Sequence, residues 1–368
     1  MRSKPLATVF LILLLTGAAP RAICAREQFI FRSTIRLQNR GEEAYIITRE
    51  DSTLHIFPDT TWQTVSFRNA SHGIREEYTD IDGNRVGVID LPSSIPPGET
   101  LVFSIEYIIA SEDRPREEIN TAEAWEITDI PLELVERYNS ETETFRRNEE
   151  IEALARELAE GESTVLGVVT SILGWIVSNV TYCSFEVPLY PDETLEDLQG
   201  DCDDQAILFI SMLRSVDIPA ILQIGVVFSE SISSEKDTLQ GHLTYRQEGV
   251  GWHGWAMVYI PPWGWVPVDL TLTSSRDPLE MILQAPEYES FIVPAFNVSR
   301  QAYIGESRVS RELLLVSDLY ITVSDIVLED SMAPGFTNIL YIGIGLAAGT
   351  VIVFSIMFVR RRRAIMWD

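Results

Sequence analysis

The sequence predicts an α+β protein in which a β-rich N-terminal module precedes a domain of helices packed on an antiparallel sheet. Two patterns along the chain lead to this fold class. Apolar and polar side chains alternate in residues 27–110, which is typical of half-buried strands. From Glu149 onward, apolar side chains recur every three or four residues, which indicates amphipathic helices. We therefore expect a β-sandwich at 26–112, a linker at 113–147 and the α+β domain at 148–300.

Two strands and one hairpin turn carry the prediction for the N-terminal module. Asp82-Gly83 lies between two extended stretches and is typical of a tight hairpin. The segment 80–84 also resembles a calcium loop faintly, but it lacks the ligand spacing and the closing glutamate of an EF-hand, so the hairpin is favoured. The apolar positions of like parity are Phe29, Phe31, Ile35 and Leu37 in the first strand, and Leu101, Phe103, Ile105 and Tyr107 in the last.

The second domain is expected to begin with helices and to end with strands. Helices are predicted from Glu149, over 165–177 and over 200–214. Strands are predicted at 220–228, 253–259 and 265–269, the last two joined by the turn Pro261-Pro262-Trp263-Gly264. The polar stretch 229–250 is expected to form a loop or an irregular hairpin. Residues 301–337 are expected to form a β-rich stalk or an extension of the sheet.

Both ends of the chain carry targeting features. Residues 1–25 have a positive start, a short apolar run and small residues before Ala25, which is typical of a secretory signal peptide. An uncleaved anchor, or a lipid attached to Cys24, is the alternative. Residues 338–359 include an uncharged run long enough to cross a bilayer, and four arginines begin the tail 360–368. Because positive charge stays cytoplasmic, we expect a single-pass cell-membrane protein with its N-terminal domains outside.

Composition excludes several classes of protein. The net charge of −27 disfavours a nucleic-acid-binding protein, which needs concentrated cations to displace counterions from phosphates. Three cysteines are too few for a disulfide-stapled scaffold, and four histidines argue against a His-rich metal site. No cofactor and no metal are expected. The oligomeric state has no signature in the sequence.

Cys202 is the candidate nucleophile. It lies at the start of the predicted third helix, where unpaired N–H groups and the helix dipole favour a thiolate. Asp203 and Asp204 follow at once, and their charges oppose that shift. A cation is therefore needed beside the thiol, and His253 is the obvious source.

Asp269 is the candidate partner of His253. Each residue lies eight positions from Pro261, so a hairpin turning there would bring the two side chains together at its open end. Asp269 would then orient the imidazole and stabilise its protonated form. Cysteine, histidine and aspartate in this relation form a nucleophile, a base and an orienting group.

Three segments resemble the transglutaminase-like superfamily, and they occur in the order found in that family. Gly200–Ala206 (GDCDDQA) resembles the nucleophile helix. Trp252–Tyr259 (WHGWAMVY) and Gly264–Thr271 (GWVPVDLT) resemble the histidine and aspartate strands. The helices predicted between Ile151 and Tyr182 resemble the pair that precedes the nucleophile. The resemblance covers about residues 148–275.

The resemblance implies a papain-like α+β core and acyl transfer through a thioester. The implied catalytic residues are Cys202, His253 and Asp269, acting on an amide bond of a protein or peptide. Tyr182 is the candidate for an upstream aromatic residue that helps the Cys202 N–H form the oxyanion hole. The sequence departs from the common family pattern at four positions, which leaves the substrate class open: Asp217, Ile221, Gly254 and Leu270.

Non-catalytic interpretations of the same residues stay open. The family includes transglutaminases, peptidases and inactive relatives, so the chain could be a surface adhesion or scaffolding protein that binds through the same fold. Cys183 could form a disulfide with Cys202. Cys183 and His242 could also join Cys202 and His253 in a zinc site, although the spacing matches no common zinc module. The four tryptophans at 252, 255, 263 and 265 are expected to pack in the core around the hairpin.

Overall fold

The computed structural model describes residues 27–273 and 275–328. The predicted signal peptide at 1–25, membrane helix at 338–359 and tail at 360–368 lie outside these residues. Within the described ranges, no helix has the length and apolar character needed to cross a membrane.

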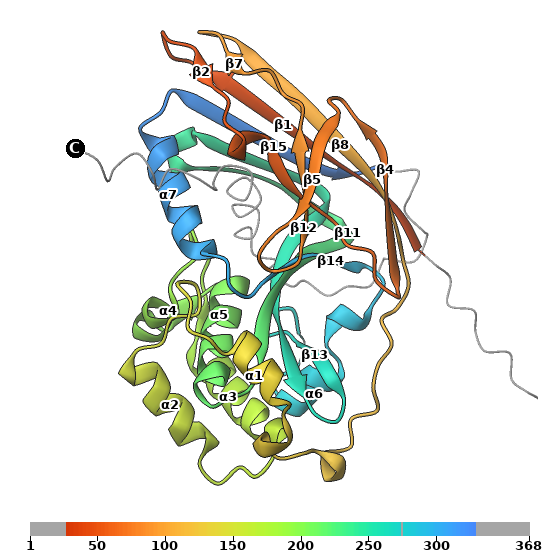
Figure 1. Ribbon diagram of the computed structural model, residues 1–368, viewed down its shortest axis with the longest axis vertical. Helices are drawn as coiled ribbons and strands as arrows, with labels where there is room; N and C mark the ends of the chain where they lie inside the picture. The colour runs from red at the N-terminus through yellow and green to blue at the C-terminus, as the bar shows by residue number, and fades with distance from the viewer. Residues whose placement is uncertain (1–26, 274, 329–368) are drawn as a thin grey trace, which may run out of the picture.

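One eight-stranded sheet runs through the whole described molecule (Figure 1). Its strand order is β14-β11-β12-β15-β1-β8-β4, and β13 pairs with the last residues of β12. All neighbours are antiparallel except β12 and β15. The strands are β1 (Glu27–Asn39), β4 (Gln63–Ala70), β8 (Thr100–Ser111), β11 (Ala220–Thr238), β12 (Leu243–Ile260), β13 (Gly264–Val268), β14 (Ile292–Val298) and β15 (Leu319–Val327).

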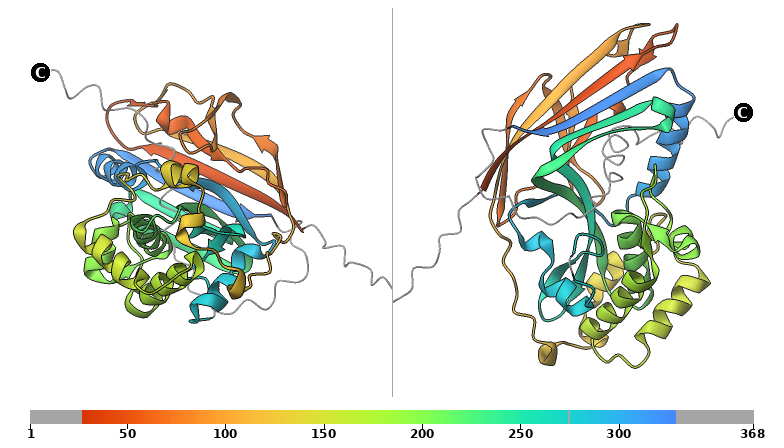
Figure 2. Two further views of the ribbon diagram at one scale, coloured as in Figure 1. Left: turned by 60° about the horizontal axis from the view of Figure 1, so that its bottom comes forward. Right: turned by 180° about the vertical axis from the view of Figure 1, so that it is seen from behind.

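Helices pack on the lower part of this sheet, and α6 lies between β13 and α3 (Figures 1 and 2). Helix α5, which begins at the candidate nucleophile, packs on β11 and β12 and is surrounded by α2, α3 and α4. The helices expected from the 3.6-residue period are confirmed. The helices are α1 (Leu132–Tyr138), α2 (Glu149–Ala159), α3 (Val165–Asn179), α4 (Pro191–Asp197), α5 (Cys202–Ser215), α6 (Pro278–Leu283) and α7 (Tyr303–Leu315).

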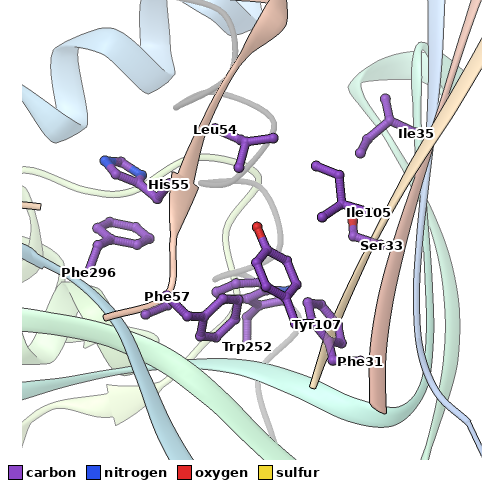
Figure 3. Close-up of a pocket in the computed structure, with 11 residues that line it drawn as sticks. Phe31, Ser33, Ile35, Leu54, His55, Phe57, Ile105, Tyr107, Trp252 and Phe296 are labelled. Atoms are coloured by element: carbon purple, nitrogen blue, oxygen red, sulfur yellow. The ribbon is translucent and has the colours of Figure 1, made fainter. Parts of the chain in front are cut away.

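The strand periodicity expected in the N-terminal module is confirmed, since Phe29, Phe31, Phe103 and Ile105 are all buried. A second, three-stranded sheet faces β1 and β8, as a sandwich requires. Apolar side chains fill the space between the layers and enclose a small cavity of about 50 Å³ beside Tyr107 (Figure 3). The smaller sheets are β3-β6-β5 (Thr53–Ile56, Arg85–Ile89, Ile74–Thr79), β2-β7 (Tyr45–Ile46, Ser94–Ile95) and β9-β10 (Thr181–Tyr182, Gln199–Gly200).

The expected separation of two cores differs from the structure. Strand β15, which follows the candidate site in sequence, pairs with β1 over nine residues on one side and with β12 on the other. The buried apolar side chains accordingly form one main cluster that extends from Phe29 to Val327. The physical reason is that the sandwich shares its larger layer with the second domain. Whether residues 26–112 and 148–300 fold independently stays a prediction.

The polar stretch 229–250 is part of a hairpin with one irregularity in its register, which is the second of the two expected alternatives. Strands β11 and β12 pair along almost their full length, with one register shift between Phe228 and Ser233. The turn is the short 3-10 segment Leu239–Gly241. The many polar side chains of this hairpin obscured the strand pattern in the sequence, because one face of the hairpin is exposed. The sheet extension predicted after residue 301 is β15. Helix α7, which precedes it, was not expected.

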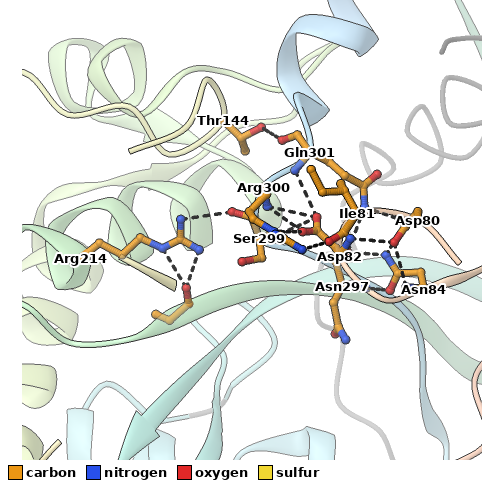
Figure 4. A network of polar contacts seen from close by, with 11 residues as sticks. Asp80, Ile81, Asp82, Asn84, Thr144, Arg214, Asn297, Ser299, Arg300 and Gln301 are labelled. Carbon is orange, nitrogen blue, oxygen red and sulfur yellow. Dashed lines mark hydrogen bonds and ion pairs between the residues drawn. The ribbon is translucent and has the colours of Figure 1, made fainter. Parts of the chain in front are cut away.

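The tight turn at Asp82-Gly83 is confirmed between β5 and β6, and its acidic side chains accept hydrogen bonds from backbone N–H groups (Figure 4). The Asp82 carboxylate accepts hydrogen bonds from the backbone N–H groups of residues 299–301 at 2.9 to 3.2 Å. Asp80 accepts from Asn84 and from the side chain of Gln301. This turn therefore fixes the segment between β14 and α7.

Candidate active site

Cys202 is the first residue of α5, as the sequence predicted, and it is 2 % exposed. The helix start is closed by a reciprocal cap in which the Asp204 carboxylate accepts the N–H of Asp201 at 3.1 Å. The Cys202 thiol receives a hydrogen bond from the backbone N–H of Gly254 on β12. The sulfur therefore lies against the residue that follows His253 in the chain.

Gly254 allows this close approach of helix and strand. A Cβ atom at position 254 would lie 3.1 Å from the Cβ of Asp203 and 3.0 Å from the Cδ1 of Ile224. Both contacts are tighter than side chains normally make, so an alanine would push α5 away from β12. The departure from the family pattern at this position thus has a packing reason.

His253 and Asp269 form the predicted pair. The Nε2 atom of His253 lies 2.6 Å from Oδ2 of Asp269, and both side chains are buried. The other carboxylate oxygen, Oδ1, accepts the backbone N–H groups of Thr271 at 2.7 Å and Leu272 at 2.8 Å. Burial opposes the charge on Asp269, but His253 and these donors outweigh it and hold the pKa of Asp269 well below its usual value.

Tyr182 lies beside the nucleophile. Its short strand β9 pairs in parallel with β10, which puts Tyr182 opposite Gly200, two residues before Cys202. The side chain is partly exposed, and burial of the rest together with the nearby Cys202 and acidic groups raises the pKa of its hydroxyl. Its place agrees with the prediction, while its role in an oxyanion hole stays a prediction.

Three aspartates surround the start of α5, and all are buried. Asp204 binds the backbone N–H groups of Leu189 and Asp201. Asp203 accepts a hydrogen bond of 2.7 Å from the hydroxyl of Tyr303 on α7 and contacts the carboxyl of Asp201. Burial and the neighbouring charges raise the pKa of Asp201 well above its usual value and that of Asp204 to about 7.

These surroundings raise the pKa of the Cys202 thiol, whereas the sequence led us to expect a lowered pKa. Burial, followed by the charges of Asp201 and Asp203, raises the pKa of Cys202 well above its usual value. The hydrogen bond from Gly254 lowers it by less. The sequence indicated that the aspartates would oppose a thiolate, but it contained no measure of burial. These surroundings therefore favour the neutral form of the Cys202 thiol.

Glu287 is a member of the site that the sequence reasoning missed. It lies in the 3-10 segment Pro286–Tyr288, and its Oε1 atom is 3.8 Å from Nε2 of His253. Its carboxyl group hydrogen-bonds that of Asp269, and burial followed by the Asp269 charge raises the pKa of Glu287 well above its usual value. None of the three motifs includes this residue, and its position after the last motif carried no signal of a role.

Among the described residues, two separate groups of three side chains could offer ligand atoms to a metal ion. Within each group, these atoms lie within 4.8 Å of one another. One contains Asp201, Cys202 and Asp203, and the other His253, Asp269 and Glu287. In both groups hydrogen bonds link neighbouring acidic or imidazole side chains, and a cation would compete with those bonds. A cation in either group would also engage a residue of the triad.

The remaining candidates from the sequence lie elsewhere or have ordinary roles. Cys183 and Cys202 are both free thiols, so the alternative disulfide is absent from this structure. His242 binds the carbonyl oxygen of Leu319 at 3.0 Å. Trp252 and Trp255 are buried in the core as expected, and Trp255 stacks on His253 at 5.8 Å between ring centroids. Trp263 and Trp265 are only partly buried against it.

Comparison with solved structures supports the same fold. A candidate cysteine protease from Cytophaga hutchinsonii superposes with a TM-score of 0.50 at 17% identity, covering 88% of this chain and 96% of that protein. A candidate protease from Parabacteroides distasonis ATCC 8503 (TM-score 0.28, 11% identity, 75% and 68% covered) and LapG of Legionella pneumophila (0.24, 19%, 45% and 94%) are similar too weakly to carry an argument.

Comparison with protein families tests the resemblance directly. No curated protein matches this chain. Residues 152–270 match the family model described as the transglutaminase-like superfamily, and this range contains Cys202, His253 and Asp269. The structure is a mixed α/β fold whose curled sheet is consistent with such a core. The resemblance of this chain to the transglutaminase-like superfamily is therefore confirmed over residues 152–270.

Proposed function

We propose that the protein is a cysteine-dependent acyl transferase or peptidase that cleaves amide bonds of proteins or peptides through a thioester. The observation that carries this proposal is the hydrogen bond of 2.6 Å between His253 and Asp269, on the strand whose Gly254 N–H binds the Cys202 thiol. The three residues come from α5, β12 and the end of β13, so only the folded chain assembles them.

The order of proton transfers follows from which imidazole nitrogen is engaged. Since Nε2 of His253 donates to Asp269, Nδ1 is the nitrogen that accepts the Cys202 proton. The thiolate attacks the amide carbonyl carbon to form a C–S bond. The C–N bond then breaks, and the leaving amine takes the proton from His253. Water or a second amine resolves the thioester and returns the proton to Cys202.

Oxyanion stabilisation comes from the start of α5. The Cys202 N–H lies at the positive end of the helix dipole, where the charge of a tetrahedral intermediate develops. Tyr182 lies across the β9–β10 pair from Gly200, which supports our proposal that its side chain assists the Cys202 N–H. Because the raised pKa favours a neutral thiol, we propose that His253 removes the Cys202 proton during the attack. A thiolate–imidazolium pair is then not formed in advance.

The setting that we propose is the outer face of a cell membrane. The signal-like residues 1–25, the apolar run within 338–359 and the arginines of the tail support this proposal. The strongly acidic composition suits an exterior domain and disfavours a nucleic-acid partner. Protease added to intact cells should remove the exterior part and leave an epitope on the tail intact.

A second candidate function has one observation in its favour. Burial and two carboxylates raise the pKa of Cys202, which is the reverse of what a stored thiolate needs. The same fold could then serve a non-catalytic adhesion or scaffolding protein that binds a surface partner.

A comparison of two cysteine variants separates the two functions. The full chain is assayed on a peptide library with and without added amine, which also distinguishes hydrolysis from cross-linking. Cys202→Ala should abolish turnover, whereas the matched variant Cys183→Ala should retain it, because Cys183 lies outside the triad. Equal turnover by both variants, or an electrophilic peptide that labels only Cys183, would establish that Cys202 is not the nucleophile.

A further inference from the structure

Glu287 is a buried acidic group beside His253 and Asp269 that the proposed mechanism does not use. Its side chain is almost fully enclosed, and its Oε1 atom lies 3.8 Å from Nε2 of His253. The same carboxyl contacts the carboxyl of Asp269, which binds His253 directly. Glu287 is therefore placed to act on the imidazole through the aspartate.

The hydrogen bonds around Glu287 limit its protonation state. Within the described residues, neither of its side-chain oxygens has a conventional donor from another residue. The group that it contacts, Asp269, already accepts two backbone N–H groups and the imidazole. Two ionised carboxylates in contact would repel each other, so their contact is favourable only when one of them carries a proton. Asp269 has the donors, and Glu287 is therefore the protonated partner.

The charged groups that face Glu287 agree with this assignment. They are His253 from β12, Asp269 after β13 and Arg114 from the segment before α1. Arg114 directs its guanidinium to the carbonyl oxygen of Trp265 at 3.2 Å and to the sulfur of Met257 at 3.5 Å. Its attraction for a negative charge on Glu287 is weaker than burial and the repulsion by Asp269.

We propose that Glu287 is a positioning residue whose neutral carboxyl donates a hydrogen bond to Asp269 and so holds Oδ2 of Asp269 against Nε2 of His253. This proposal rests on the proposed triad and adds a fourth member to it. The bond fixes the Asp269 side chain without neutralising it. The proton stays on Glu287, because no other residue that the structure describes donates a hydrogen bond that would stabilise a charged Glu287 carboxylate. Loss of that proton at alkaline pH removes the bond and adds repulsion, so it should contribute to the fall in activity on the alkaline side.

Two substitutions test the donor role in the full chain. Glu287→Gln keeps an N–H donor of the same length but cannot ionise, so its kcat should stay within about threefold of the wild type. Glu287→Ala leaves the Asp269 oxygen without its donor, so kcat should fall about 10- to 100-fold with little change in KM. The alkaline limb of the pH profile should move to higher pH in Glu287→Gln. Equal losses in both variants, or an unchanged limb, would overturn the proposal.

A second measurement is independent of turnover. The proton on Nε2 of His253, followed by NMR, should keep its position in Glu287→Gln and should shift in Glu287→Ala. Asp51→Asn, a matched change at another buried carboxyl with ordinary donors, should leave the signal unchanged. If the signal behaves in this way while Cys202→Ala leaves turnover intact, the positioning role stands and the proposed catalysis fails. A signal that is the same in Glu287→Ala and in the wild type refutes the positioning role.

Discussion

The two halves of the candidate site both place buried carboxyl groups beside a reactive side chain, yet the carboxyls differ in charge. Beside His253, Asp269 has two backbone N–H donors and the imidazole, and its pKa lies well below the usual value. Beside Cys202, Asp201 has a buried oxygen without a partner in the described structure, and its pKa lies well above the usual value.

The difference shows that the donors around an acid, and not its residue type or burial, decide whether it is charged. All these side chains are almost fully buried, so the cost of desolvation is similar. Hydrogen bonds to the charged form of Asp269 offset that cost, whereas Asp201 and Asp203 face each other and one of them is stabilised in its protonated form. One half of the site holds an ionised aspartate against the imidazole, and the other half disfavours a thiolate.

The largest effect on turnover is expected when the ionised carboxylate beside His253 is removed. Asp269→Ala should lower kcat by about 10³- to 10⁴-fold, because the imidazole loses both its orientation and its counter-charge. Alkylation of Cys202 by iodoacetamide should slow much less, since it requires no oriented proton transfer to a leaving group. Asp277→Ala, which removes only the cap of α6, is the control and should retain turnover. Parallel losses in labelling and turnover would contradict this division of roles.

A smaller effect is expected when a carboxylate beside Cys202 is neutralised, and it concerns the rate at which Cys202 is labelled. Asp203→Asn keeps an acceptor for the Tyr303 hydroxyl but removes a charge that raises the Cys202 pKa. That pKa should fall, so labelling of Cys202 at pH 7 should be about tenfold faster. Cys183 in the same molecule reports on general reactivity and should label at an unchanged rate. A slower reaction of Cys202 would mean that Asp203 supports the thiolate rather than opposing it.

The smallest effect concerns stability against pH. The pKa is raised to about 7 for Asp204 and Glu306 and to about 6 for Asp325. Since the folded state binds these protons more tightly, their contribution is complete at acidic pH and is lost as the pH rises through 6 to 7. The Tm should therefore be about 5 °C higher at pH 5 than at pH 8.

Asp269 has the opposite shift, and its contribution is lost only below its ordinary pKa, outside this window. Calorimetry on Asp325→Asn should show a weaker dependence than the wild type, because an amide at that position beside Trp252 cannot ionise. A Tm that rises steadily from pH 5 to pH 8 would show that the buried acids do not dominate.

Local patterns in the sequence were sufficient for the elements and for the order of the triad. The parity of Phe29 and Phe31 predicted β1, and the period of 3.6 residues predicted α2 and α3. Their positions about the Pro261 turn and their shared parity predicted that His253 and Asp269 would meet. The observed register is centred one residue later, so position 269 falls opposite Trp255, and the two side chains meet diagonally. Each of these inferences depends on near neighbours in the chain.

Long-range pairing decided what the sequence did not contain. No local pattern indicates that β15 joins β1 to β12, or decides between a loop and a hairpin for the polar stretch 229–250. Glu287 and Tyr303 likewise reach Asp269 and Asp203 from other segments of the chain, and the charge on each carboxyl depends on those neighbours. The sequence by itself determined which residues can react. Burial and the hydrogen-bond donors assembled by the tertiary structure decided their protonation, since desolvation and contact exist only in the folded chain.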